Sequence, residues 1–265
     1  MKLAFHSCYS LIRLSGVTYL ETAITAAKEA GELLRDNFHQ PKNVDEALHH
    51  DLKLELDRKT QDLIFERIGE QFPDHALYGE EGLGGNQSSE YQWIVDPIDG
   101  TVNFFYGIPH FCVSIALRQG VELLVGVIYD PMTDELWSAE RGGQVLLNDR
   151  PLSVSKRDKL EEAIVFIGCG KDEEALTVGL ERFRKASLRC RKMRMMGSAA
   201  LAMAYTASGR LDAYVESRIS LWDIAAGQLI LEMAGGACEL VPNVEKPDVY
   251  AIKATNGLIP IDEVL

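Results

Sequence analysis

Apolar residues recur with the period of a helix near the start of the chain. Thr18 and Glu21 have the spacing of a capping box, which is a pattern that starts helices. A polar stretch over residues 41–50 is interpreted as a loop, and a second amphipathic pattern then runs to Phe72 and ends before Pro73. We therefore expect two helices at the start of the ordered chain. The apolar positions on the face of the first are Ile24, Ala27, Gly31, Leu34 and Phe38.

Short apolar runs predict strands between residues 76 and 147. These runs cover residues 76–78, 93–95, 112–117, 121–129, 135–139 and 145–147. The links between most of them are short, which favours hairpins and an antiparallel sheet. Pro97 follows the run at 93–95, and because proline has no backbone N–H we expect the ladder of that strand to stop there.

The second half of the chain alternates strands and helices. We expect strands at residues 164–167, 193–195 and 212–216, and helices over residues 172–188, 198–208 and 222–234. The last helix ends at Gly235-Gly236, as a helix capped by a left-handed glycine does. This order predicts a fold of layered sheets and helices, classed as α+β or α/β. We expect an appendage at residues 1–17, an N-terminal α+β lobe at 18–155 and a smaller C-terminal α/β lobe at 156–265.

Charge and cysteine content restrict the partners and the compartment. The formal net charge of −13 disfavours nonspecific binding to nucleic acid or to anionic membranes. No apolar run approaches the ~20 residues that cross a bilayer. The five cysteines are widely spaced and include no Cys-x-x-Cys, which argues against a disulfide framework or a zinc site and favours a reducing cytoplasm. A basic run over residues 182–194 is interpreted as a solvated helix end, with an anion or partner site as the alternative.

Two acidic pairs stand where predicted strands end. Asp96 and Asp99 follow the run at 93–95, and Glu80 and Glu81 follow the run at 76–78. The first pair on its own fits an ordinary turn as well as a metal site, because Asp, Pro and Gly are common turn formers. Four carboxylates at neighbouring strand ends repel one another unless cations bind among them. Oxygen ligands of this kind suit Mg²⁺, with Mn²⁺ as the alternative.

A phosphate site and a third acidic element complete the candidate chemistry. Gly100 gives a turn, and Thr101 can start a helix whose free N–H groups attract an anion such as phosphate. Asp223 stands at the start of the helix predicted over 222–234, where an acidic residue commonly complements the helix dipole.

Three segments together resemble the inositol monophosphatase family. They are Gly79-Glu80-Glu81, the run from Trp93 to Thr101, and Trp222-Asp223-Ile224-Ala225-Ala226-Gly227 followed by Gly235-Gly236. Their order and spacing also match, and the resemblance extends from about Thr18 to Asn256. It implies an α-β-α-β-α sandwich, a homodimer, dependence on two or three Mg²⁺ ions and sensitivity to lithium.

The resemblance also implies roles for individual residues. Thr101, paired through its hydroxyl with Asp57, would orient the attacking water and help Glu80 to activate it. Ser198 and Ala199 are equally well explained as the start of a helix, and Glu216 as a solvated strand end. The metal ligands implied are Glu80, Asp96, Asp99, Asp223 and the carbonyl of Ile98. The substrate contacts implied are Asp99, Gly100, Thr101, Gly197, Ser198, Ala199 and Glu216.

The chain departs from the family pattern before Asp57. It has Lys53-Leu54 where relatives often have Val-Thr, and Glu46 where some relatives have Lys. Any contact that residues 41–56 make with metal or substrate is therefore left open.

The resemblance implies a Mg²⁺-dependent hydrolase of a small polyol phosphate, with inositol 1-phosphate as the first candidate. No motif offers a persuasive nucleophile, so we expect water to attack phosphorus directly. The alternative substrates are fructose 1,6-bisphosphate, 3′-phosphoadenosine 5′-phosphate, histidinol phosphate and NADP. A noncatalytic regulatory or binding protein on the same fold is the alternative of another class.

Overall fold

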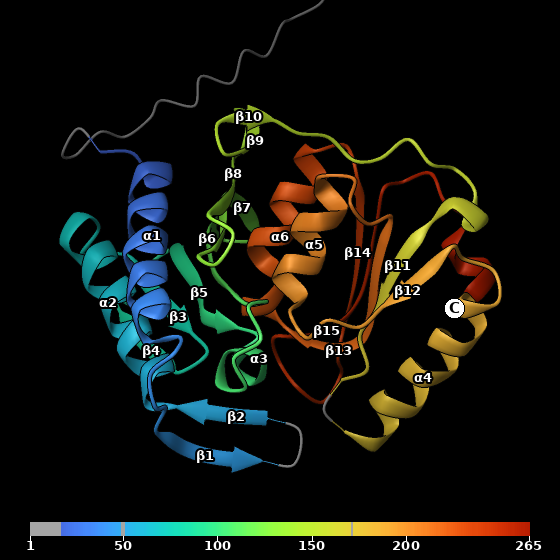
Figure 1. The fold of residues 1–265 in the computed structure, drawn as a ribbon. Helices are drawn as coiled ribbons and strands as arrows, with labels where there is room; N and C mark the ends of the chain where they lie inside the picture. Colours follow the sequence, from blue (N-terminus) through green and yellow to red (C-terminus); the bar gives the residue numbers. More distant parts are fainter. Residues whose placement is uncertain (1–16, 49–50, 171) are drawn as a thin grey trace, which may run out of the picture.

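The computed structural model describes residues 17–48, 51–170 and 172–265, and it has five layers (Figure 1). Helices α1 and α2 cover one face of the first sheet, α5 and α6 lie between the two sheets, and α4 covers the outer face of the second sheet. The predicted α-β-α-β-α sandwich is confirmed. Residues 1–16 of the expected appendage lie outside the described residues. The lobe boundary at 155/156 stays a prediction.

The outer helices begin where the sequence predicted. Helix α1 (Tyr19–Asn37) starts with a complete capping box, in which Thr18 Oγ1 accepts from the N–H of Glu21 and Glu21 Oε2 accepts from the N–H of Thr18. Helix α2 spans Glu55–Gln71. Gly31 lets α1 lie close to the sheet, because a Cβ at this position would stand 2.4 Å from Tyr129 Cε1.

The first sheet has the strand order β10-β9-β8-β7-β6-β5-β3-β4. All neighbours are antiparallel except β3 and β5, which are parallel. The short strands β4 and β10 were not predicted. The bounds are β3 Ala76–Gly79, β4 Gly82–Gly85, β5 Tyr91–Asp99, β6 Cys112–Gln119, β7 Glu122–Asp130, β8 Glu135–Glu140, β9 Val145–Leu147 and β10 Arg150–Pro151.

The expectation that the ladder of β5 stops at Pro97 is wrong. Asp96 pairs with Ser114 of β6, and after a shift in register Asp99 pairs with Cys112. Proline is tolerated at such an irregularity, because a ladder hydrogen bond is already missing there. Strand β5 therefore carries both aspartates, and the short helix α3 (Thr101–Phe105) follows it directly.

The interpretation of residues 41–50 as a loop is also wrong. Strand β1 (Val44–Leu48) pairs antiparallel with β2 (Asp51–Leu54), and residues 49 and 50 between them lie outside the described residues. Glu46 stands directly opposite Lys53 in this hairpin. Opposite charges at such a position stabilise a strand pair that has little apolar surface to bury.

The second sheet has the order β12-β11-β13-β15-β14. Its first three strands are parallel, and β15 and β14 add antiparallel pairs. The sequence did not predict β14 and β15. The bounds are β11 Ile164–Ile167, α4 Glu173–Ser187, β12 Lys192–Arg194, α5 Ala199–Ala207, β13 Ala213–Ser220, α6 Leu221–Met233, β14 Ala237–Pro242, β15 Val249–Thr255, and the 3-10 helices η1 Leu160–Glu162 and η2 Ile261–Val264.

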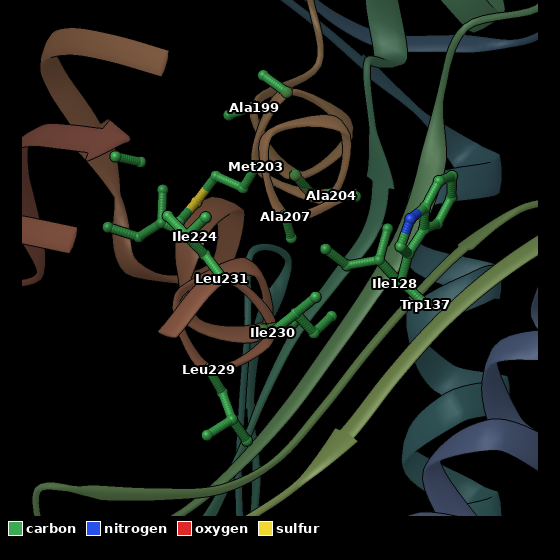
Figure 2. Packing of buried hydrophobic residues seen from close by; sticks show 14 of the residues in the cluster. Ile128, Trp137, Ala199, Met203, Ala204, Ala207, Ile224, Leu229, Ile230 and Leu231 are labelled. Carbon is green, nitrogen blue, oxygen red and sulfur yellow. The ribbon is translucent and has the colours of Figure 1, made fainter. Parts of the chain in front are cut away.

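Helices α5 and α6 form the centre of the core. Figure 2 shows Ile128 and Trp137 of the first sheet beside the side chains of these two helices. The helices lie close together, because a Cβ on Gly227 would stand 2.6 Å from Met203 Cβ. Gly126 in turn lets β7 approach α6 closely. This packing fixes the N-terminal ends of both helices against the first sheet.

The basic run at residues 182–194 lies at the end of α4 and on β12. Arg184 pairs with Glu181 on its own helix, and Arg189 pairs with Glu263 of η2. These pairs are exposed, as the interpretation of a solvated helix end requires. No helix in the described part of the chain has the length and apolar character needed to cross a membrane.

A buried carboxylate ties the segment after β10 to the second sheet. Asp212 is fully buried, and it accepts hydrogen bonds from Arg157 Nε, from the hydroxyl of Ser155 and from the N–H of Ile164. Asn256 holds the same corner by donating to Ser155 Oγ and to the carbonyl of Arg157. These partners replace the water that the Asp212 side chain loses on burial.

We expect Asp212→Asn to lower the free energy of unfolding by about 3 kcal/mol, because it leaves the Arg157 guanidinium without its charged partner in a partly buried site. Urea denaturation measures this change. Asp158→Asn, at a nearby exposed aspartate, is the matched control. Equal stabilities for the two variants would contradict the role given to Asp212.

Candidate active site

Three carboxylates from separate elements meet at one point. Asp96 and Asp99 come from the end of β5, and Asp223 comes from the first turn of α6. One oxygen of each lies within 4.8 Å of the others. Asp223 is oriented by its own helix start, since its Oδ2 accepts from the N–H of Ser220 at 3.0 Å. The structure thus brings together three of the predicted metal ligands, and their binding of a metal stays a prediction.

Asp99 is held by the N-terminus of α5. Its Oδ2 accepts from the Ser198 hydroxyl at 2.6 Å and from the N–H of Ala200 at 2.7 Å, and the N–H of Ala199 lies 3.3 Å from Oδ1. The positive end of the helix dipole stabilises a carboxylate at this position. Ser198 also caps α5, because its Oγ accepts from the N–H of Leu201. In this structure Ser198 and Ala199 thus contact Asp99, and a direct contact of theirs with substrate stays a prediction.

Burial and mutual repulsion both disfavour the charged form of Asp96 at this corner. The pKa of Asp96 lies well above its ordinary value, first because the side chain is buried and then because of the negative charges of Glu80, Asp223 and Asp99. Glu80 follows β3, in the turn to β4, and its N–H donates to the carbonyl of Val95, the residue before Asp96. Hard oxygen donors that repel one another in a buried site fit a divalent cation such as Mg²⁺.

Thr101 and Asp57 stand next to this cluster. Thr101 Oγ1 lies 2.9 Å from the carbonyl oxygen of Ile98, to which it donates, and 3.5 Å from Asp57 Oδ1. Asp57 Oδ2 accepts from the N–H of Leu54 at 2.6 Å. Burial raises the pKa of Asp57 to about 8, although that hydrogen bond acts in the opposite direction. The charges of Glu80 and Glu81 raise it further.

The turn between β5 and α3 requires glycine. Gly100 has φ of 101°, and a Cβ there would stand 3.0 Å from the carbonyl oxygen of His110. Gly197, with φ of 81°, lies across from it on the segment before α5. Asn103 joins the two segments, since its Nδ2 donates to the carbonyls of His110 and Met196. Asn103 thereby fixes the start of α3 against the segment that leads into α5.

Glu216 on β13 is oriented by hydrogen bonds. Its Oε2 accepts from the Tyr214 hydroxyl at 2.6 Å, and its Oε1 accepts from the N–H of Gly170 at 3.0 Å. A Cβ on Gly168 would overlap this carboxylate, so a glycine is needed there. The side chain is only partly exposed, which makes it a fixed acceptor; its contact with substrate stays a prediction.

Sequence reasoning missed several residues that shape the site. Gln61 Oε1 accepts from the N–H of Glu81 at 2.9 Å and thereby holds the turn that carries Glu80. Cys112 lies with its Sγ 3.8 Å from Asp99 Oδ2. Asn103 could have been considered as a site residue only because it lies just after the Gly100-Thr101 turn. No pattern in the sequence pointed to Gln61 or Cys112.

The chain is similar to known proteins over most of its length. A model of the inositol monophosphatase family matches residues 17–249. An inositol-1-monophosphatase of Mesorhizobium japonicum is 41% identical over 225 residues, covering 82% of this chain and 83% of that protein. A Nus factor SuhB of Pasteurella multocida is 37% identical over 221 residues, covering 82% and 83%. The solved structure of an inositol monophosphatase from Anabaena (Nostoc) has a TM-score of 0.80 at 34% identity, and 93% of each chain is covered.

The raised pKa of Asp57 predicts how stability depends on pH in the metal-free protein. Its folded-state pKa of about 8 exceeds the ordinary value of 3.8, so the folded state binds more protons between these values. The contribution of Asp57 to stability therefore falls as the pH rises from about 4 to about 8. We expect Asp57→Asn to flatten this fall, measured by urea denaturation in EDTA. Asp62→Asn on the exposed face of α2 is the control, and parallel curves for wild type and Asp57→Asn would contradict the assignment.

Proposed function

The chain belongs to the inositol monophosphatase family and is a phosphoric monoester hydrolase, and we propose that it hydrolyses a small polyol phosphate, inositol 1-phosphate first, with Mg²⁺ as its cofactor. The observation that carries this proposal is the convergence of Asp96, Asp99 and Asp223 beside the turn at Gly100 and Thr101. Carboxylates for a metal and N–H groups for a phosphate then serve one reaction centre.

The proposed metal ligands are all oxygen atoms, which suits Mg²⁺, with Mn²⁺ as the alternative. Two or three divalent ions would offset the repulsion that raises the pKa of Asp96. Asp96 is the candidate for a ligand shared by more than one ion, because the charges of Glu80, Asp223 and Asp99 all act on it. The full proposed set is Glu80, Asp96, Asp99, Asp223 and the carbonyl of Ile98.

Uncatalysed phosphate monoesters react so slowly that enzymes accelerate their hydrolysis by up to ~10²¹-fold, whereas acid-base catalysis supplies only ~10²- to 10⁴-fold. Bound Mg²⁺ would supply the remaining electrostatic stabilisation, by acidifying a water and by stabilising the leaving oxygen. Thr101 Oγ1 would orient the attacking water, helped by Glu80. The hydroxyl of Thr101 can turn from Ile98 O toward Asp57 Oδ1. The positive charge of bound Mg²⁺ would lower the pKa of Asp57, and its ionised carboxylate would then receive the proton.

The backbone N–H groups of Gly100 and Thr101 would bind the phosphoryl oxygens, as helix starts commonly do. The oxygen of water would then form a bond to phosphorus while the ester P–O bond breaks. The products are inorganic phosphate and the alcohol, whose oxygen gains a proton. No covalent phosphoenzyme is needed.

Glu216 supports a substrate with several hydroxyl groups. A carboxylate held by Tyr214 and Gly170 accepts hydrogen bonds but donates none, so it suits a polyol better than a second phosphate. Gly197, Ser198 and Ala199 are proposed to complete the substrate side of the site.

The resemblance to the family supports two further proposals, namely that the enzyme is a homodimer and that lithium inhibits it. The widely spaced cysteines without a Cys-x-x-Cys support a third proposal, that it is cytoplasmic. Its substrate would be a small phosphate ester, and neither nucleic acid nor membrane is proposed as a partner.

We expect Asp96→Asn to lower the Mg²⁺-dependent kcat/KM for inositol 1-phosphate by at least about 100-fold, because it removes the charge at the centre of the ligand set. Steady-state phosphate release measures this loss. Asp74→Asn, at an exposed aspartate, is the control. Near-normal activity of a folded Asp96→Asn variant would contradict the ligand assignment.

A substrate panel separates the proposal from its alternatives. The wild-type enzyme is assayed on inositol 1-phosphate, fructose 1,6-bisphosphate, 3′-phosphoadenosine 5′-phosphate, histidinol phosphate and NADP, with and without Mg²⁺ and Li⁺. The proposal predicts the highest kcat/KM for inositol 1-phosphate. A higher kcat/KM for another compound of the panel would identify that compound, instead of inositol 1-phosphate, as the substrate. No turnover of any compound, together with no Mg²⁺ binding by calorimetry, would favour a noncatalytic protein.

A further inference from the structure

Lys53 reaches the catalytic corner from the β1–β2 hairpin. Its Nζ lies 3.3 Å from Glu81 Oε1, and this carboxylate belongs to the turn that also carries Glu80. The charge of Glu81 is close enough to Asp57 to raise the pKa of Asp57. The ammonium of Lys53 therefore pairs with a carboxylate whose charge acts on Asp57.

The hairpin holds Lys53 on the side of the turn at Gly100 and Thr101, which is the proposed phosphate site. Strand β2 packs against α3, the helix that begins at Thr101. Glu46 lies directly across from Lys53 on β1, and Glu81 faces it from the turn after β3. The Lys53 side chain is 33% exposed and that of Glu81 is 10% exposed. The ion pair thus stands at the mouth of the site, with the carboxylate inside and the ammonium toward solvent.

We propose that Lys53 is a substrate-binding residue, whose ammonium binds a phosphoryl oxygen of the substrate from the hairpin side of the site. This inference rests on the proposed function, since it assumes that the phosphate occupies the turn at Gly100 and Thr101. An ammonium has three N–H donors, and Glu81 Oε1 takes one of them. Another donor can contact a phosphate that arrives at the same mouth.

The contact between Lys53 and phosphate matters because the rest of the site is negatively charged. The chain carries a net charge of −13, and the catalytic corner is built from carboxylates, so a phosphate dianion is repelled on approach. Lys53 provides a fixed positive charge that does not depend on metal occupancy. Because it would hold the phosphate in the ground state and the transition state alike, its loss should raise KM more than it lowers kcat.

The test measures binding of inorganic phosphate in saturating Mg²⁺ by calorimetry, together with kcat and KM for inositol 1-phosphate. For Lys53→Met we expect Kd for phosphate and KM to rise about tenfold, the loss typical of one charge-assisted hydrogen bond, at unchanged Tm. Lys53→Arg should recover most of the affinity. Lys59→Met is the matched control, because Lys59 is 61% exposed and pairs with Glu55 on α2.

Glu81→Gln separates substrate binding from a structural role of the ion pair. If Lys53 binds phosphate, this variant keeps or tightens phosphate binding, because the ammonium loses its competing carboxylate. The inference is overturned if Lys53→Met binds phosphate within about twofold of wild type, or if Glu81→Gln weakens binding as much as Lys53→Met does. A wild-type protein without Mg²⁺-dependent turnover would instead refute the proposed function, and the phosphate titration would still decide the role of Lys53.

Discussion

Repulsion among buried carboxylates is the interaction on which this structure depends. Asp96 and Asp99 leave β5 into a buried corner, and Asp223 meets them from α6. Local hydrogen bonds offset part of the free-energy cost of placing these carboxylates together. The Ser198 hydroxyl and the N–H of Ala200 donate to Asp99, and the N–H of Ser220 donates to Asp223. The pKa of Asp96 nevertheless lies well above its ordinary value, so the corner favours a bound cation. The same unfavourable feature that costs stability in the metal-free protein would thereby supply affinity for the cofactor.

The packing of α5 and α6 between the sheets makes this convergence rigid. Glycine at 126 and at 227 lets the strand and the two helices approach within contact distance, so that their N-terminal ends cannot shift independently. The turn at Gly100 adds the proposed phosphate site, because the φ of 101° at this residue leads the chain from β5 directly into α3. Ligands that are far apart in sequence therefore meet because the core aligns the ends of the elements that carry them.

The sequence predicted what local patterns encode. The capping box at Thr18 and the left-handed Gly235 follow from short-range rules, and both are present. The acidic pair after Val95 lies at the end of β5 as expected, although the strand continues to Asp99. Strand β14 escaped prediction because it is a mostly exposed edge strand with no buried alternation. The contact of Ser198 with Asp99 spans 99 residues, and no local pattern encodes it. The segment at 41–50, interpreted as a loop, contains strand β1, which pairs with the strand that carries Lys53. This polar pairing has no apolar alternation by which the sequence could have predicted it.

The most direct test of this account is the free energy of unfolding of the wild-type protein at neutral pH in EDTA and in rising Mg²⁺ concentrations. If cations relieve the repulsion at the carboxylate corner, stability rises with the logarithm of the Mg²⁺ concentration once the sites begin to fill. The gain should be about 1.4 kcal/mol for each tenfold increase beyond the dissociation constant of a site. A free energy of unfolding that is the same in EDTA and in millimolar Mg²⁺ would contradict the account.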